Sequence, residues 1–309
     1  MTPSELQYYV PDDIPPEVLA YEAELLQLGV GKSGKVGALA LTLEESSGKT
    51  VIRELYSRVP LRVQRALYLE ESLPSMAYLY LISPSEGILQ GDRLRIDIAL
   101  KNNARVHITT QSATKLYYME RNYATQIVNI SLDDGCYLEY VPDQIIPYSH
   151  SRFYQKVSLK IHGNSTLVYS EVVVPGRIAH GESFGYDVCY LKTLARNQRD
   201  ELTFVDVARL VPKARNLKTL GILGDYDVFG NIYVVTSKKY LAELRSRVNS
   251  ARQEFPNLFV GATTLPHDSG ILVRVLGDRA EEIKPFIYEV VAIVRKLVLD
   301  APFSGVRKQ

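Results

Sequence analysis

The chain has 309 residues, of which 46% are apolar, so it can fill a substantial core in one large domain or two ordinary ones. Its 36 Lys and Arg residues against 35 Asp and Glu residues give a formal net charge of +1, which excludes recruitment of nucleic acid or anionic membranes by a global field. The two cysteines, Cys136 and Cys189, form no CxxC pair, which argues against a disulfide framework and a structural zinc site.

Residues 1–28 are predicted to form an extension with one short helix. Acidic residues and prolines at positions 12–16 precede an amphipathic segment from Glu17 to Leu26, and Gly29 follows it. The N-terminus has no signal-peptide pattern, and no stretch approaches the roughly 20 apolar residues of a membrane span. We therefore expect a cytoplasmic protein with neither nucleic acid nor a membrane as partner.

The segment from Gly29 to Val36 resembles a phosphate-binding P-loop but departs from it in two ways. Its glycines and Lys35 have the correct spacing, yet Val36 stands where a Ser or Thr must bind Mg²⁺. A P-loop also follows a strand and opens a helix, whereas here a helical pattern precedes the segment and a strand-like pattern follows it. These departures argue against a nucleotide site.

Residues 29–210 are predicted to form an all-β body. Apolar and polar residues alternate in many segments, such as 94–98 and 105–109, and Gly, Pro, Asn or Asp bound most of them. Strand follows strand with no helical pattern between them, which excludes a βαβ enzyme fold. No repeat of fixed period is present, so a coil of strands would form without a sequence code.

Residues 211–309 are predicted to form a smaller α+β lobe. The elements follow in this order: a strand at 232–236, a helix at 238–254 with Ser237 as its cap, strands at 258–264 and 270–276, and a helix at 278–300. The expected fold is therefore mainly β, a β-helix-like coil or sandwich of many strands, with a C-terminal lobe that contains two helices.

The stretch from Gly135 to Pro147 interleaves apolar residues with Glu139 and Asp143. Buried carboxylates are costly unless they are paired, hydrogen-bonded or bound to a metal. The alternative is that both lie on the solvated face of an edge strand and its turn, because prolines in sheets occupy edges or ends. The stretch alone does not decide between these interpretations.

Four segments of the β body set charged residues among turn-forming residues, in this order: Gly87 to Asp92, Thr109 to Lys115, Leu138 to Pro142 and Pro175 to Glu182. By these motifs the chain resembles the urease accessory protein family UreD/UreH over about residues 29–210. Glu86 departs from the first motif, because a glycine is usual at that position.

The resemblance implies a scaffold for nickel delivery and not an enzyme. Members of this family have a β-rich, helix-like coil of strands with two C-terminal helices. They bind a helical accessory protein of the UreF type and, through it, a nickel-carrying GTPase of the UreG type. They also dock on apo-urease and are thought to offer an internal passage for the ion. No tightly bound cofactor is expected, only nickel in transit.

The residues expected to line such a passage are Asp92, Glu139, Asp143, Glu171 and Glu182, with Lys115 and Arg177 as possible charge partners. Carboxylates and water coordinate Ni²⁺ weakly and exchangeably, which suits transit better than storage. The five histidines show no HxH or HxxxH spacing, so a tight metal site is not indicated. An ordinary internal ion pair is the structural alternative for Lys115 and Arg177.

Two rival functions stay open. One is a β-coil carbohydrate-active enzyme, a hydrolase or lyase with Glu139 and Asp143 as general acid and base. Its groove would present exposed aromatic platforms, but the chain has no Trp, and many of its 21 tyrosines alternate with aliphatic residues. The other is a plain interaction scaffold without metal transit, in which the carboxylates only stabilise turns.

Overall fold

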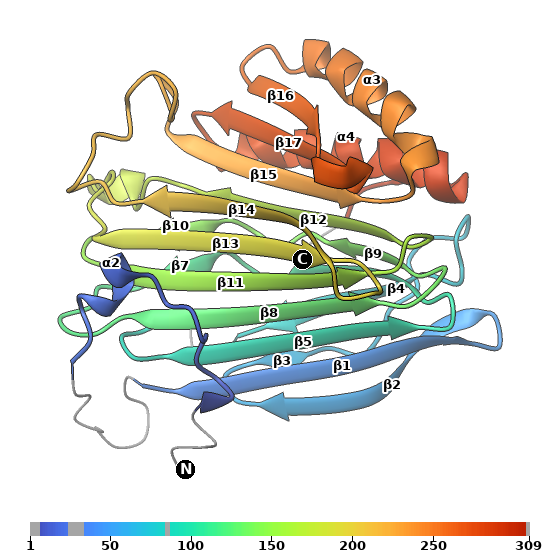
Figure 1. Ribbon diagram of the computed structural model, residues 1–309, viewed down its shortest axis with the longest axis horizontal. Coiled ribbons are helices and arrows are strands. Elements are labelled where there is room, and N and C mark those ends of the chain that lie inside the picture. The colour runs from blue at the N-terminus through green and yellow to red at the C-terminus, as the bar shows by residue number, and fades with distance from the viewer. Residues whose placement is uncertain (1–6, 24–33, 84–86, 307–309) are drawn as a thin grey trace.

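Two β-sheets stacked face to face make up most of the molecule (Figure 1). The computed structural model describes residues 7–23, 34–83 and 87–306. Sheet A has seven strands, in spatial order β14 (Leu202–Leu210), β13 (Val188–Arg196), β11 (Arg152–Ile161), β8 (Ala124–Leu132), β5 (Arg93–Lys101), β1 (Val36–Ser46) and β2 (Lys49–Arg58).

Sheet B has ten strands. Eight lie in the spatial order β16 (Phe259–Thr264), β17 (Gly270–Gly277), β15 (Val228–Val235), β12 (Thr166–Val173), β9 (Tyr137–Tyr140), β6 (Arg105–Thr110), β4 (Ala77–Ile82) and β3 (Arg62–Val63). Two short strands, β7 (Thr114–Leu116) and β10 (Ile145–Pro147), pair with each other, and β10 also pairs with β12. Both short strands therefore lie beside the row of eight strands.

The chain alternates between the two sheets, so that successive strands form a coil. In sheet A, the adjacent strands β1, β5, β8, β11 and β13 run parallel to one another, and in sheet B the same holds for β4, β6, β9 and β12. Each coil therefore stacks on the preceding one through parallel hydrogen bonding. The prediction of a mainly β fold with a helix-like coil of strands is confirmed.

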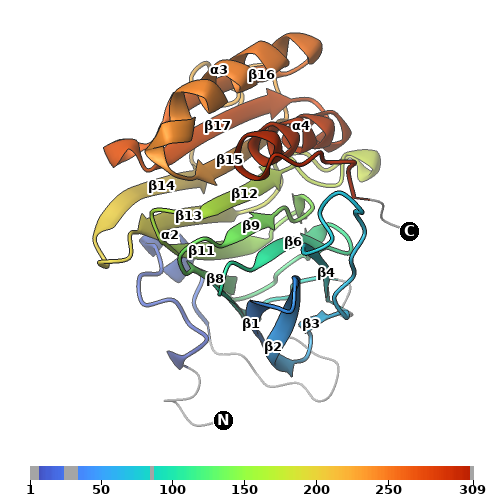
Figure 2. The ribbon, with the colours of Figure 1, turned by 90° about the vertical axis from the view of Figure 1, so that its right-hand side faces the viewer.

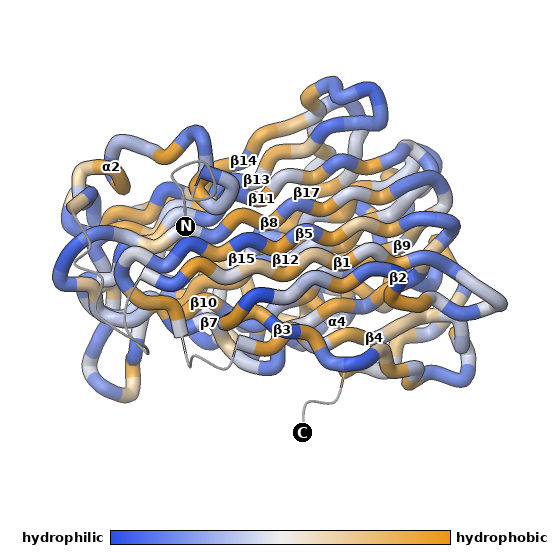
Figure 3. Tube along the Cα trace, turned by 90° about the horizontal axis from the view of Figure 1, so that it is seen from below, coloured by the Kyte–Doolittle hydropathy of each residue, from blue (hydrophilic) through white to orange (hydrophobic). Residues whose placement is uncertain are grey.

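Strand alternation divides the core into two layers. On β6, Val106 and Ile108 point between the sheets, whereas His107 points to the opposite face of sheet B. The inter-sheet layer is filled mainly by Leu, Ile and Val, and hydrophilic residues gather in the loops at the ends of the strands (Figure 3). Because side chains alternate with period two, one strand supplies both layers.

The C-terminal strands extend both sheets in antiparallel fashion, and two helices cover the outer face of sheet B (Figure 2). These helices are α3 (Leu241–Ala251) and α4 (Ala280–Leu299), which confirms the two predicted helices. The first starts with a 3-10 turn after Ser237, whose side chain makes no capping hydrogen bond. This turn is η2 (Lys238–Tyr240), and the other 3-10 turns of the described residues are η1 (Ile178–His180), η3 (Arg252–Glu254) and η4 (Pro266–Asp268).

Among the described residues, no helix combines the length and the apolar character needed to cross a lipid bilayer. The P-loop-like segment lies largely outside the described residues, which exclude 24–33, and Glu86 lies outside them as well.

The N-terminal residues 7–23, here called the strap, lie across the outer face of sheet A (Figure 1). Its helix α2 (Pro16–Leu19) is shorter than the predicted helix. Asp13 lies 2.6 Å from Lys192 and accepts a hydrogen bond from Tyr154, and both partners are on sheet A. Val18 is fully buried against Tyr154 and its neighbours. The strap is therefore anchored by both charge and apolar contact.

We expect Val18→Ala to lower the free energy of unfolding by about 1–2 kcal/mol, because it removes a buried aliphatic side chain from the contact between the strap and the outer face of sheet A. Deleting residues 1–28 should leave a single cooperative transition, since the described part of this segment, residues 7–23, contributes no strand to either sheet. Thermal and urea unfolding of both variants check this. A matched Leu19→Ala change at an exposed position of the same helix should have little effect, and loss of cooperative melting after the deletion would contradict the prediction.

Candidate functional site

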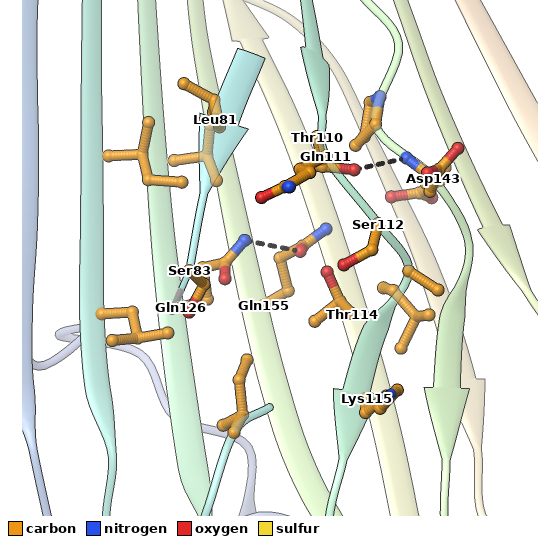
Figure 4. A pocket seen from close by; sticks show the side chains of 18 of the residues that line it. Leu81, Ser83, Thr110, Gln111, Ser112, Thr114, Lys115, Gln126, Asp143 and Gln155 are labelled. Carbon is orange, nitrogen blue, oxygen red and sulfur yellow. Dashed lines mark hydrogen bonds between the residues drawn. The ribbon is translucent and has the colours of Figure 1, made fainter. Parts of the chain in front are cut away.

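A cavity of about 90 Å³ lies between the two sheets, next to the short strands β7 and β10. Its walls are formed partly by apolar residues of both sheets and partly by polar side chains: Thr110, Gln111, Ser112, Thr114, Lys115, Gln126, Asp143, Gln155 and Glu171. Figure 4 shows these polar groups, apart from Glu171, arranged around the space, with Gln126 hydrogen-bonded to Gln155 and the Asp143 amide to Thr110. The Thr109 to Lys115 motif therefore supplies one wall of an internal space.

From this cavity a continuous chain of hydrogen-bonded side chains runs through the space between the sheets. Gln126 donates to Gln155 at 3.3 Å, and Gln155 donates to the Tyr169 hydroxyl at 3.2 Å. Tyr169 in turn donates to Glu171 at 2.9 Å. We call the whole series the polar chain; its members are Gln126, Gln155, Tyr169, Glu171, Asn231, Tyr233, Asp206 and Arg274.

Glu171 is the central carboxylate of the polar chain. On β12 it shares the inner face with Tyr169 and Val173, and Asn231 of the adjacent strand β15 donates to its Oε1 at 2.9 Å. Burial raises the pKa of Glu171, and the donors Asn231 and Tyr169 only partly offset this. A buried carboxylate whose pKa is raised in this way is a candidate functional group.

At its far end the polar chain reaches Asp206 on β14 and Arg274 on β17. Tyr233 Oη lies 2.8 Å from Asp206 Oδ2 and 3.3 Å from Glu171 Oε1, so this hydroxyl links the two carboxylates. Arg274 Nη2 donates to Asp206 Oδ1 at 2.7 Å. Here the chain meets a groove of about 1020 Å³ between β14, the loop at 211–227 and β16.

Asp143, a predicted passage residue, and Lys115, a predicted charge partner, both lie at the cavity. The Asp143 carboxylate is 3.0 Å from the Lys284 ammonium on α4, and its amide donates to Thr110. Together with Glu171, they are the three predicted residues that the fold brings to this one space. No group of three His, Cys, Asp or Glu side chains within the described part of the chain is placed to hold a metal ion.

The other predicted carboxylates lie elsewhere. Asp92 accepts hydrogen bonds from the amides of Lys35 and Leu89, so it fixes the turn before β5, and burial raises its pKa. Glu182 forms an ion pair with Arg177 in the loop at η1, and the pairing lowers the pKa of Glu182. Neither carboxylate contributes to the walls of the internal cavity.

Glu139 lies on the face of sheet B opposite to Glu171, under helix α4. Its two oxygens lie 2.5 and 2.7 Å from Nε and Nη2 of Arg295, and Oε2 is 2.6 Å from Nδ1 of His107. Burial alone would raise the pKa of Glu139, but Arg295 and then His107 outweigh it and lower the pKa. This fully buried cluster joins α4 to sheet B.

The same contacts weigh against Glu139 and Asp143 as a general acid and base pair. Such a pair must reach a substrate, whereas the Glu139 side chain is fully buried and Arg295, His107 and Tyr137 occupy its oxygens. The Asp143 carboxylate is ion-paired with Lys284 of α4 and borders the internal cavity. The geometry therefore does not support the carbohydrate-active alternative.

Sequence reasoning missed Asp206, Asn231 and Arg274. One signal was available: β15 is buried at every position, and Asn231 is its one side chain with a hydrogen-bonding amide. A lone amide in a buried strand requires a polar partner. Asp206 lies two residues after Phe204 on β14, and Phe204 is buried. Because side chains in a strand alternate, this spacing also indicated that Asp206 faces the inside.

Comparison with known proteins gives a consistent result. A family model described as UreD urease accessory protein matches residues 35–308. A urease accessory protein UreD from Cenarchaeum symbiosum is 42% identical over 282 residues, covering 91% of this chain and 99% of the relative. The corresponding proteins from Yersinia pseudotuberculosis and Photorhabdus laumondii are each 36% identical, over 96% and 92% of this chain and 94% and 89% of the relatives.

Proposed function

The chain belongs to the UreD family of urease accessory proteins and so has a role in urease maturation, and we propose that it acts there as a scaffold that passes nickel to apo-urease. It bridges apo-urease and a helical UreF-type accessory protein with its nickel-carrying UreG-type GTPase, in the cytoplasm. It acts as a carrier and not as an enzyme, and nickel is its cargo. The observation that carries this proposal is the polar chain through the inter-sheet space.

Three carboxylates mark the proposed route: Asp143 at the cavity, Glu171 in the middle and Asp206 at the groove. A divalent cation between two sheets loses most of its hydration, and carboxylates along the route offset this cost. Oxygen ligands hold Ni²⁺ less tightly than imidazole or thiolate, so the ion moves on. Asp92, Glu139 and Glu182 are left with structural contacts and are not assigned to the route.

Exposed apolar side chains at two opposite ends of the molecule support a bridging role. Leu220, 98% exposed, and Phe259, 63% exposed, border the groove beside β14 and β16. On β2, at the other edge of sheet A, Leu55 is 53% exposed and Tyr56 is 54% exposed. Clustered exposed apolar side chains mark protein interaction sites, and two separate ends provide for two partners at once (Figure 1).

We expect Leu220→Lys and Leu55→Lys each to weaken the binding of a different partner. A lysine in the centre of an apolar contact typically costs an interface about 2 kcal/mol or more, which is roughly a thirtyfold loss of affinity. Pull-down with apo-urease alone and with the helical accessory protein alone measures this. Ile178→Lys, at an apolar position in the loop at η1 that is as exposed as Leu55, is the control. Loss of the same partner by both variants, or of neither, would contradict a two-ended bridge.

Co-purification tests the proposal as a whole. The tagged chain is expressed with apo-urease, the helical accessory protein and the GTPase, and the eluted complex is assayed for activation that depends on GTP and nickel. The proposal expects a stable complex whose activation requires this chain. If urease is activated equally without the chain, the proposal fails. If the complex forms but nickel transfer is unaffected by substitutions in the polar chain, a plain interaction scaffold without metal transit explains the data better.

A further inference from the structure

We infer that Arg274 blocks the groove end of the polar chain against cations, so that nickel passes only when this side chain leaves Asp206. The inference rests on the proposed passage and adds a gating residue to it. Arg274 lies on β17 of sheet B, whereas Asp206 lies on β14 of sheet A, so their contact spans the two sheets at the groove.

Both oxygens of Asp206 are occupied in this arrangement. Oδ1 accepts from Arg274 Nη2 at 2.7 Å, and Oδ2 lies 2.8 Å from the Tyr233 hydroxyl. Arg274 Nη1 also donates to the side-chain oxygen Oδ1 of Asn231 at 3.2 Å. The guanidinium thus occupies two of the oxygen acceptors at this end of the polar chain, and the Tyr233 hydroxyl occupies the second oxygen of Asp206.

The charge of Arg274 adds to this obstruction. A guanidinium stays protonated at any physiological pH, so a positive charge always stands at this end of the passage. Two like charges about 4 Å apart repel each other strongly near a protein surface, and a divalent ion is repelled more strongly still. A cation therefore cannot share Asp206 with Arg274; one must displace the other.

The solvent exposure of the Arg274 side chain allows it to move away from Asp206. The Arg274 side chain is 52% exposed and lines the groove, whereas Asp206 is only 16% exposed. Arg274 can therefore turn into the groove and keep its hydration while Asp206 stays in place. The contrast is Arg295, which is fully buried among its partners and has no solvated alternative position.

The alternative is that the Arg274–Asp206 ion pair only stabilises the packing of the two sheets. The two roles predict different results when Arg274 is replaced. Loss of a purely structural ion pair lowers stability without admitting metal, whereas loss of a gate makes Glu171 and Asp206 accessible to cations. Half-exposed ion pairs contribute little to stability. Metal access is therefore the property that separates the two roles.

The test is equilibrium dialysis of Ni²⁺ against the full chain, with thermal melting of every variant. Arg274→Gln should bind Ni²⁺ roughly tenfold more tightly than the wild type, a change of about 1.4 kcal/mol. Adding Glu171→Gln should abolish this gain, and Arg274→Lys, which keeps the charge, should bind like the wild type. Arg274→Met is a second uncharged variant that retains the aliphatic stem, and Arg247→Gln on α3 is the control at an exposed ion pair.

Unchanged nickel binding in both Arg274→Gln and Arg274→Met, with or without a lowered melting temperature, would overturn the gate. The outcome is separable from the failure of the passage itself. If Glu171→Gln alone leaves urease activation at the wild-type level, the passage is wrong whatever Arg274 does. If Glu171→Gln impairs activation while the Arg274 variants bind nickel like the wild type, the passage stands and only the gate is wrong.

Discussion

Replacing Arg295 by methionine is expected to lower the free energy of unfolding by about 3–5 kcal/mol, because it leaves Glu139 as a buried charge without its main partner. Arg295 is fully buried and contacts Glu139 through two nitrogens, Glu70 at 2.5 Å and the Tyr78 hydroxyl at 2.8 Å. Among the described residues, the other groups that contact the Glu139 oxygens are the His107 ring and the Tyr137 hydroxyl. Urea unfolding followed by circular dichroism gives the change.

Two further variants separate the cause of this loss from simple packing. Arg247→Met removes an exposed ion pair on α3 and should change stability by less than about 0.5 kcal/mol. The double variant Glu139→Leu with Arg295→Met replaces both charges by apolar groups and should recover most of the loss, since a buried ion pair is often no better than a well-packed apolar pair. A double variant as unstable as the single one would show that packing around Arg295 matters more than the charge.

Glu171→Gln is expected to slow nickel incorporation into urease roughly tenfold or more, since an interaction with a charged group is worth roughly 1.5–3 kcal/mol. Glutamine keeps the shape of the side chain and can accept from Asn231 as Glu171 does. Partner binding should be unchanged, because Glu171 is buried between the sheets. Urease activity per unit of enzyme in cells that co-express the accessory proteins measures the effect.

The same variant should be more stable than the wild type at pH 7. Burial raises the pKa of Glu171, so the folded state keeps a proton that the unfolded chain, with a Glu pKa of about 4.3, has already lost. Wild-type stability therefore falls as the pH rises from about 4.3 through the higher folded pKa, and Gln removes this part of the slope. A variant that is less stable than the wild type at pH 7 and equally sensitive to pH would contradict the account of Glu171.

The coil of strands was predictable because its cause is local. Alternation in segments such as 94–98 and 105–109 encodes strands with one buried face, and both segments lie within strands of the structure. The two C-terminal helices were predicted close to their observed ranges, although the residues at their N-termini make no side-chain capping hydrogen bond. Only the N-terminal helix was predicted too long, because α2 ends at Leu19 and the chain then continues as part of the strap.

The grouping of the carboxylates was not predictable from the same patterns. Glu139 and Glu171 are both buried in neighbouring strands of sheet B, yet they face opposite layers, because the parity of a residue within its strand decides its face. Their partners come from distant segments: Arg295 from α4 and Asn231 from β15. Pairings across more than 50 residues depend on how the sheets stack, which no local pattern encodes.

Arg274 and Asp206 show the same limit at the surface. Asp206 shares the parity of the buried Phe204, and Arg274 is the one charged side chain of β17, but neither pattern identifies the other residue as its partner. They meet only because β14 and β17 end up on facing sheets beside the same groove. The contact between Arg274 and Asp206 at the end of the polar chain therefore depends on how the two sheets stack, and no single segment of the sequence encodes it.

The most direct test of the passage is the rate at which radioactive nickel moves from the charged GTPase to apo-urease within the purified complex. The account predicts slower transfer with each of Asp143→Asn, Glu171→Gln and Asp206→Asn, which lie along one route, at unchanged complex assembly. Glu182→Gln, which removes a carboxylate outside the cavity, should transfer nickel at the wild-type rate. Equal transfer rates for all four variants and the wild type would contradict an internal passage for nickel.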